Sequence, residues 1–185
     1  MELREDELIA ACKKNKRKAR NKLYKLYANK LLGICLRYTR NLPEAEDVLH
    51  DSFIKIFTKI DQYSGKGNFE AWMKRITANT AIQHLRDKAK ENTFLSGDNV
   101  EEINIAEESE DVSIQIPAQD LLKMIQELPD GYKMVFNLYV FEEMGHKEIA
   151  ALLDISEGTS KSQYHRAKQY LQNEITNHIQ ELNKE

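Results

Sequence analysis

The sequence predicts an all-α protein made of two small helical domains. Only seven Gly and three Pro occur in 185 residues, and strict alternation of β-branched and polar residues is missing. Apolar residues instead recur three and four positions apart over long segments, which is the spacing of amphipathic helices. We therefore expect an N-terminal helical bundle over residues 1–90, an acidic linker over 91–117 and a second helical domain over 118–185.

The N-terminal part contains several predicted helices. Residues 21–39 and 41–60 each carry an apolar stripe at helical spacing. The second segment begins with Asn41 and Pro43, which favour the first turn of a helix. Ser and Gly residues mark a loop within 61–68, and helical spacing resumes directly after it.

The C-terminal part is predicted to form four helices. Pro129 and Gly131 divide residues 118–144 into two, and Gly145 is expected to end the second of them. Two helices around the tight turn "DIS" follow within residues 146–171. Such a helix-turn-helix is a layout that places its second helix in the major groove of DNA.

The second helix of this pair has an apolar and a polar side. Ser156 is expected to cap its N-terminus through the side-chain hydroxyl. The inner face is predicted to comprise Ser160, Tyr164, Ala167 and Leu171. The side chains expected to contact phosphates and base edges are Ser156, Thr159, Lys161, Ser162, His165, Arg166 and Lys168. A solvated charged face in a small bundle is the alternative interpretation.

Charge is unevenly distributed along a chain whose net charge is only −3. Residues 1–90 hold 20 Lys and Arg against 11 Asp and Glu, residues 91–117 hold eight acids and no base, and residues 118–185 hold seven bases and 11 acids. The stretch KKNKRKARNKLYK, residues 13–25, contains eight bases and no acid. A nucleic-acid binder needs a local positive field and not a positive total, so the acidic total does not exclude DNA as a partner.

The sequence does not point to an enzyme, a metal site or a membrane protein. Asp47 and His50 match half of a helical carboxylate–histidine pattern used in di-metal bundles, but a second intact pair is missing. Gly-rich phosphate loops, nucleophile elbows and Cys/His clusters do not occur. Cys12 and Cys35 have no metal-ligand spacing and are expected to be free thiols in a reducing cytoplasm. We therefore expect a cytoplasmic chain with no catalytic residue, no metal, no cofactor and no membrane insertion.

Three segments resemble one protein family, in the same order and at the same separation. They are AEDVLHDSFIKIF (Ala45–Phe57), FEAWMKRITANTAIQHLR (Phe69–Arg86) and HKEIAALLDISEGTSKSQYHRAKQYL (His146–Leu171). They are similar to bacterial RNA polymerase sigma factors of the extracytoplasmic-function (ECF) type, the last to the C-terminal helix-turn-helix of that family. The resemblance implies a transcription initiation factor that binds core RNA polymerase and directs it to promoter DNA. It also implies an inhibitory anti-sigma factor as a further partner.

The resemblance implies roles for particular residues. The N-terminal domain would engage the minus-ten promoter element, and the C-terminal helix would read the minus-35 (upstream) element. Asn79 aligns with an asparagine that recognises a base turned out of the stack, whereas Trp72 fits the apolar stripe of the core better than a base-stacking role. The residues assigned to the minus-ten element are Lys74, Arg75, Asn79, Gln83 and Arg86, and those assigned to polymerase are Glu46, Asp47, His50 and Asp51.

The sequence departs from the family pattern in a few places. Gln83 stands where aspartate is common, Ser160 replaces a usual valine and Tyr164 a usual leucine. The stretch 13–25 is more basic than is typical, and its partner is left open between DNA, acids of the polymerase and solvent. A stand-alone helix-turn-helix regulator is the alternative function. It would need the C-terminal domain but not the two N-terminal motifs.

Overall fold

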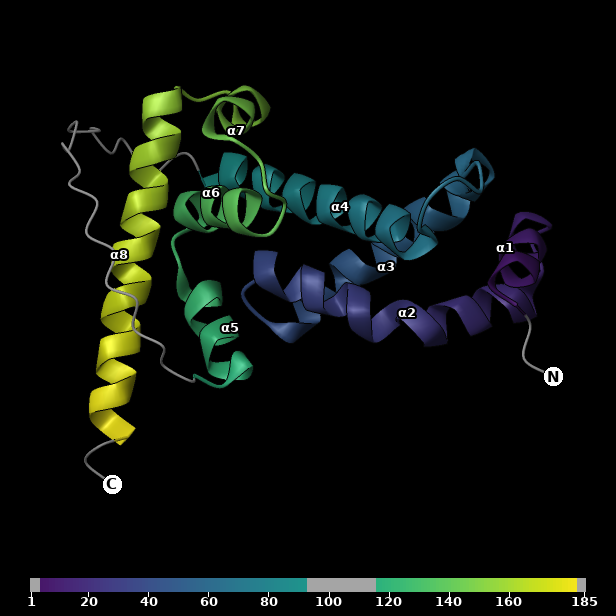
Figure 1. The fold of residues 1–185 in the computed structure, drawn as a ribbon, viewed down its shortest axis with the longest axis horizontal. Coiled ribbons are helices and arrows are strands. Elements are labelled where there is room, and N and C mark those ends of the chain that lie inside the picture. Colours follow the sequence, from purple (N-terminus) through teal and green to yellow (C-terminus); the bar gives the residue numbers. More distant parts are fainter. Residues whose placement is uncertain (1–3, 93–115, 183–185) are drawn as a thin grey trace. The chain divides into compact units, whose positions relative to one another are not determined.

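The computed structural model describes residues 4–92 and 116–182, and every regular element within these ranges is a helix (Figure 1). The prediction of an all-α protein is therefore confirmed. The chain forms two compact units, residues 1–87 and 88–185, and most of the predicted linker lies outside the described residues. The elements are α1 (Glu5–Lys13), α2 (Arg17–Tyr38), α3 (Leu42–Lys59), the 3₁₀ turn η1 (Ile60–Gln62), α4 (Phe69–Asn92), α5 (Ala118–Glu127), α6 (Asp130–Val140), α7 (His146–Leu153) and α8 (Glu157–Leu182).

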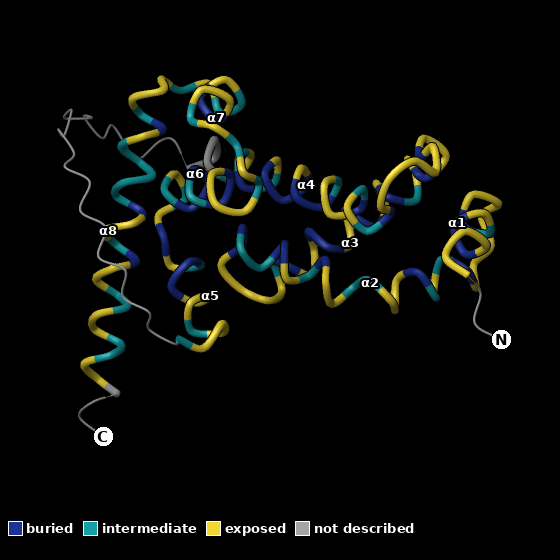
Figure 2. The backbone as a smooth tube through the Cα atoms, viewed as in Figure 1, coloured by how far each residue is buried: buried dark blue, intermediate teal, exposed yellow. Residues whose placement is uncertain are grey.

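Helix α3 begins where the sequence predicts. The N–H of Glu44 donates to Oδ1 of Asn41 at 2.9 Å, and Pro43 lies in the first turn. The face that α3 buries comprises Ala45, Val48, Leu49, Ser52, Phe53 and Ile56. In Figure 2 buried positions likewise recur along α4. Both helices are thus amphipathic, and each leaves one side to solvent.

The loop between η1 and α4 is held against the end of α1. The Tyr63 hydroxyl donates to the carbonyl of Gly67 at 2.6 Å, and Nζ of Lys13 donates to the carbonyl of Tyr63 at 2.8 Å. Gly67 has a φ of 86°, a conformation that residues with a Cβ rarely adopt. Oδ1 of Asn68 accepts from the N–H of Ala71 at 3.0 Å and so caps α4.

In the second unit, α5 and α8 share an apolar core. Its buried members are Met124, Ile125, Leu128, Ala167 and Leu171. Helix α5 packs on α8 through these side chains, and α6 and α7 also contact α8. The long helix α8 is therefore the element on which this unit is assembled.

The prediction that Gly145 ends a helix is wrong. Helix α6 ends at Val140, and the chain then turns through Glu143, which has a φ of 55°. Gly145 instead precedes α7, where its N–H donates to the carboxylate of Glu148 at 2.9 Å. The break at Pro129 between α5 and α6 is as predicted, because proline favours the start of a helix over its interior.

Cys12 and Cys35 are buried free thiols. Burial raises the pKa of both, that of Cys35 to about 12, so neither is a reactive thiolate at neutral pH. Among residues 4–92 and 116–182, no group of three or more His, Cys, Asp or Glu side chains is arranged to hold a metal ion. The described helices include none with the length and apolarity needed to cross a bilayer.

Candidate nucleic-acid interface

The turn between α7 and α8 fixes where α8 begins. Asp154 adopts the left-handed conformation with a φ of 57°, so the chain changes direction directly after α7. The N–H of Thr159 donates to Oγ of Ser156 at 2.9 Å, and the two hydroxyl oxygens lie 2.8 Å apart. The predicted N-cap is therefore confirmed. The same bonds place the hydroxyls of Ser156 and Thr159 at the exposed end of α8.

The inner face of α8 is polar at one buried position. Ser160 is fully buried, and its Oγ lies 3.0 Å from Nδ1 of His146 at the start of α7. The His146 ring stacks on Tyr139 of α6 with centroids 4.6 Å apart, and the ring of Tyr164 lies 4.4 Å from that of Tyr139. Burial lowers the pKa of His146, and the charge of Lys161 acts in the same direction. Side chains from three helices thus hold α8 in the helix-turn-helix.

Three of the residues predicted to contact DNA share one side of α8. At about 100° per residue, Lys161, His165 and Lys168 fall within an arc of about 60°. Lys161 and Lys168 are exposed and His165 is half-buried. Nζ of Lys161 pairs with the Glu157 carboxylate at 2.8 Å, an exposed ion pair that contributes little to stability. Both lysines can therefore turn towards a phosphate at little cost.

Thr159, Ser162 and Arg166 occupy the adjoining arc of α8, again about 60° wide. The Ser162 hydroxyl donates to the carbonyl of Thr159 at 3.0 Å. Nη1 of Arg166 lies 3.4 Å from the hydroxyl of Tyr132 on α6. The guanidinium is thus held towards the body of the unit, and base or phosphate contact by Arg166 would require it to leave Tyr132.

In the N-terminal unit, four of the five residues predicted for the minus-ten element share one face of α4. Arg75, Asn79, Gln83 and Arg86 fall within an arc of about 80°. The first three are exposed, and Arg86 is half-buried. Nε2 of Gln83 donates to Oδ1 of Asp87 at 2.7 Å, which orients the amide. This set, called here the α4 outer face, combines two amides with two guanidinium groups.

Lys74 lies on another side of α4, about 140° around the helix from Asn79. Its Nζ pairs with Oε1 of Glu70 at 2.9 Å, and Oε2 of Glu70 accepts from Nζ of Lys30 on α2 at 2.7 Å. These two bonds lower the pKa of the Glu70 carboxyl. Lys74 therefore belongs to a contact between α2 and α4 and is separated from the α4 outer face.

Trp72 is half-buried and takes part in an aromatic cluster at the start of α4. Its ring stacks on that of Phe69, with centroids 5.5 Å apart and an interplanar angle of 17°. The ring of Tyr63 also contacts the Trp72 ring, and their centroids lie 5.5 Å apart. The expected core role of Trp72 is thus met by packing, although its burial is incomplete. One part of the ring remains open to solvent next to Arg75 and Asn79 in helical register.

The residues predicted for polymerase form an exposed acidic side of α3. Glu46, Asp47, His50 and Asp51 are all exposed. Ile54 follows Asp47 and Asp51 at helical spacing and is 52% exposed, so an apolar side chain adjoins these carboxylates on the outer side of α3. Sequence reasoning missed Ile54 because an apolar residue inside an apolar segment is taken as core. The sequence did contain a sign of its exposure, because Ile54 lies outside the helical face formed by the other apolar residues of α3.

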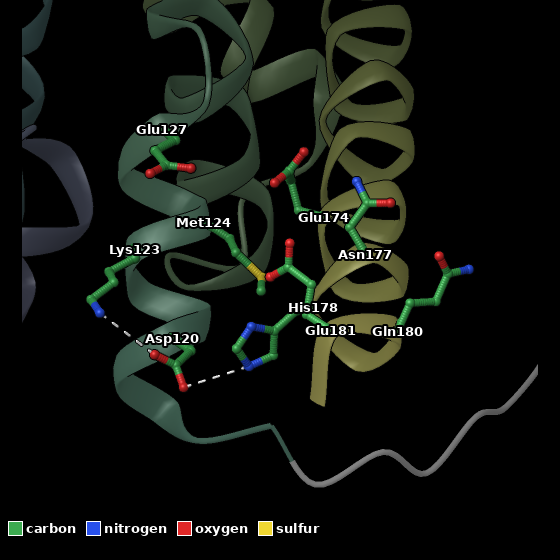
Figure 3. A pocket seen from close by; sticks show the side chains of 9 residues that line it. All are labelled: Asp120, Lys123, Met124, Glu127, Glu174, Asn177, His178, Gln180 and Glu181. Carbon is green, nitrogen blue, oxygen red and sulfur yellow. Dashed lines mark ion pairs between the residues drawn. The ribbon is translucent and has the colours of Figure 1, made fainter. Parts of the chain in front are cut away.

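A hollow of about 500 Å³ lies between α5 and the C-terminal half of α8 (Figure 3). The carboxylate of Asp120 lies 3.7 Å from Nζ of Lys123 and 3.7 Å from Nε2 of His178. Three more carboxylates, those of Glu127, Glu174 and Glu181, line the hollow. This excess of acids does not suit phosphate, so the hollow is not part of a nucleic-acid interface.

Two family models match this chain, and they match separate segments. Sigma-70 region 2 matches residues 23–91, which contain α3 and all but the last residue of α4. Sigma-70 region 4 matches residues 118–171, which contain the helix-turn-helix. Together the two segments cover more than half of the chain. The chain belongs to the sigma-70 family.

Relatives of this sigma factor are similar over nearly its whole length. An ECF RNA polymerase sigma-E factor of Haemophilus influenzae is 28% identical over 186 residues, covering 94% of this chain and 96% of that protein. The ECF RNA polymerase sigma factor SigW of Bacillus subtilis is 27% identical, covering 95% and 98%. A solved structure of the sigma factor RpoE with the anti-sigma factor NepR, from Bartonella quintana, is 22% identical with a TM-score of 0.48, covering 84% of this chain and 96% of that one.

The chain is thus a transcription initiation factor of the ECF type that directs RNA polymerase to promoters. The region 2 match favours this function over that of a stand-alone helix-turn-helix regulator. A regulator needs a helix-turn-helix, but it has no use for the domain that residues 23–91 form. The α4 outer face and the acidic side of α3 both lie in that match.

Proposed function

We propose that this sigma factor docks on core RNA polymerase through α3 and reads two elements of one promoter with α4 and α8. Residues 1–90 then serve polymerase binding and promoter opening, and residues 118–185 hold the upstream element. One observation carries the proposal: each unit presents a helix whose outer side bears donors suited to nucleic acid, and these donors lie within the segments that the sigma-70 models match. Phosphate contacts fix position on DNA, and contacts to base edges provide sequence specificity.

On the α4 outer face, the guanidinium groups and the amides have different roles. Arg75 and Arg86 bind phosphates of the minus-ten strand, since a guanidinium pairs well with phosphate oxygens. Asn79 and Gln83 read bases, because an amide both donates and accepts hydrogen bonds. Gln83 is already oriented by its bond to Asp87. Lys74 supports this face indirectly, through the ion pair that joins α4 to α2.

Helix α8 reads the upstream element in the major groove. Lys161 and Lys168 bind phosphates, and His165 between them faces the base edges. Ser156 and Thr159 at the helix N-terminus contribute hydroxyls and the positive end of the helix dipole, which favours a phosphate. Ser162 and Arg166 supply further donors from the adjoining arc. The buried contact of Ser160 with His146 sets the rotation of α8 and so decides which side chains face DNA.

Helix α3 provides the contact with polymerase. Asp47 and Asp51 offer carboxylates to basic groups of the partner, with Glu46 and His50 at the edge. Ile54 adds an apolar anchor whose burial contributes to affinity, whereas exposed charges mainly contribute to orientation and association rate. Because an exposed isoleucine has no task in the isolated unit, its removal should weaken polymerase binding and leave the fold intact.

The mechanism also explains why an acidic protein reads DNA. When the chain is bound to polymerase, α4 and α8 are held in one complex. Once one of these helices has bound its promoter element, the effective concentration of the other helix at its own element is raised. Strong free DNA binding is then unnecessary, and a net charge of −3 is tolerated. The sigma factor itself is not an enzyme, since polymerase catalyses RNA synthesis. It acts in the cytoplasm and is inhibited there by an anti-sigma factor.

The proposal is tested by transcription in vitro with purified core polymerase and a pool of templates. Core polymerase plus this chain should synthesise RNA from a subset of templates that core polymerase alone does not use. That subset should share two short sequence elements at a fixed separation. RNA synthesis that is the same with and without the chain on every template would refute the proposal.

A further inference from the structure

The turn between α1 and α2 carries an exposed group of cations without described partners. Lys14, Lys16, Arg17 and Lys18 are all exposed, and no carboxylate of residues 4–92 or 116–182 pairs with any of them. We call these four residues the basic turn. Five lysines elsewhere in the described ranges do have a carboxylate within 4.0 Å, namely Lys30, Lys74, Lys123, Lys133 and Lys161.

The start of α2 makes this arrangement unfavourable for the isolated protein. Each of the other described α-helices has an acidic residue in its first turn, whereas the first turn of α2 has none. Arg17 and Lys18 instead place positive charges at the positive end of the dipole of a 22-residue helix. Lys16 at the N-cap position provides no side-chain acceptor. An anion bound at this turn would relieve both the repulsion and the unfavourable dipole.

The position of the basic turn indicates which anion it meets. Nζ of Lys13 donates to the carbonyl of Tyr63, so the end of α1 lies beside the loop that leads into α4. A hollow of about 200 Å³ lies at this junction, lined by residues of α1 together with Tyr63, Ser64 and Gly65. Lys66 of the same loop is exposed as well. The basic turn therefore begins one residue after Lys13, which contacts the loop that precedes the α4 outer face.

We propose that the basic turn binds the phosphate backbone of promoter DNA beside the minus-ten element. Four exposed cations complement a chain of phosphates, which carries one charge per nucleotide. The turn lies directly before residues 23–91, the segment that sigma-70 region 2 matches. The inference rests on the proposed function, because it assumes that polymerase brings the minus-ten strand to α4.

The test compares two double variants of the full chain. K14Q/K18Q removes two cations of the basic turn, and K55Q/K59Q removes two exposed lysines of α3 at the same spacing. Each variant is assembled with core polymerase and titrated, over a range of salt, with a fork probe carrying the minus-ten element as a single strand. A duplex probe carrying only the upstream element is titrated in parallel, and affinity for core polymerase is measured without DNA.

The proposal predicts that K14Q/K18Q binds the fork probe about threefold to tenfold more weakly at low salt, with a log–log salt slope smaller by about 1 to 2. Affinity for the upstream probe and for core polymerase should not change, and K55Q/K59Q should match the wild type on the fork probe. Weaker core binding with an unchanged salt slope would overturn the proposal and assign the basic turn to acids of the polymerase. No difference between the variants in any assay would also overturn it.

Failure of the proposed function is separable from failure of this inference. A wild-type chain that does not join core polymerase would refute the proposed function. The basic turn can still be examined in that case, because the free chain and both variants can be titrated with a plain single-stranded oligonucleotide. Equal salt slopes for K14Q/K18Q and K55Q/K59Q there would refute phosphate binding by the basic turn.

Discussion

Nδ1 of His146 and Oγ of Ser160 lie 3.0 Å apart and join the two helices of the helix-turn-helix through a hydrogen bond. Ser160 is fully buried, and the His146 ring is stacked on Tyr139. A polar bond in a protected position is directional, whereas apolar packing tolerates small rotations. The pair therefore fixes the orientation of α8 relative to α7, and with it the direction in which the outer side chains of α8 point.

Removing the Ser160 hydroxyl should loosen this junction. In S160A, Nδ1 of His146 loses its partner in a half-buried site, which costs about 1 to 2 kcal/mol. Amide hydrogen exchange of the full chain should show faster exchange in α7 and the first half of α8. Exchange in α3 and α4 is the internal control, because they belong to the other unit. Unaltered protection of α7 and α8 would show that the bond adds nothing to the junction.

Acidification should weaken the same junction. Burial lowers the pKa of His146 below its ordinary value of 6.5, with Lys161 acting in the same sense and Glu157 opposing it. As pH falls below about 6.5, the unfolded chain takes up this proton more readily than the folded chain, so stability is lost until the folded pKa is passed. The variant H146N does not titrate. Between pH 7.5 and 5.5 the thermal midpoint of the wild type should therefore fall more than that of H146N. A difference in midpoint that does not change with pH would contradict this prediction.

Substitutions of Asn79 and Lys74 should have different effects on promoter discrimination, although both are exposed residues of α4. N79A should reduce the discrimination of holoenzyme between correct and altered minus-ten sequences by about 1 to 3 kcal/mol, because one amide reader is lost. K74A should leave discrimination unchanged, since Lys74 pairs with Glu70 on another side of the helix. The measurement is competition binding with single-base variants of a fork probe. Equal loss of discrimination in both variants would argue against base reading by the α4 outer face.

Ile54 and Leu42 offer a matched pair on α3, being 52% and 50% exposed. I54S should weaken binding to core polymerase by about tenfold to a hundredfold, because an apolar anchor of this size contributes roughly 1.5 to 3 kcal/mol when it is buried. L42S lies at the start of the helix, away from Asp47 and Asp51, and should bind as the wild type does. Fluorescence anisotropy of labelled chain against core polymerase measures both. A larger loss in L42S would place the polymerase contact elsewhere on α3.

Local features of this chain were predictable from sequence. The caps formed by Asn41 and Ser156 involve atoms only three residues apart, so residue type and spacing are sufficient to place them. The end of α6 was not predictable in this way. Helical spacing continues to Met144, but the helix ends at Val140 with Glu143 in a conformation that favours glycine. The residue types around Val140 therefore do not by themselves place the end of this helix.

The candidate site was predictable in its residue types but not in its grouping. Lys74 and Arg75 are neighbours in the sequence, yet the helix turns them to different sides, and only Arg75 shares a face with Asn79. Arg166 was expected to face DNA, and its bond to Tyr132 on α6 depends on the tertiary fold. Ile54 was missed for the same reason, since exposure is a property of the packed unit.

The most direct test of the account is a footprint of the assembled initiation complex on one promoter. Core polymerase with the wild-type chain should protect two separated segments from hydroxyl radicals and make thymines near the minus-ten element reactive to permanganate. K161Q/K168Q should weaken protection of the upstream segment, and N79A should lower the permanganate signal. The account is contradicted if polymerase without the chain gives the same footprint, or if the chain without polymerase does.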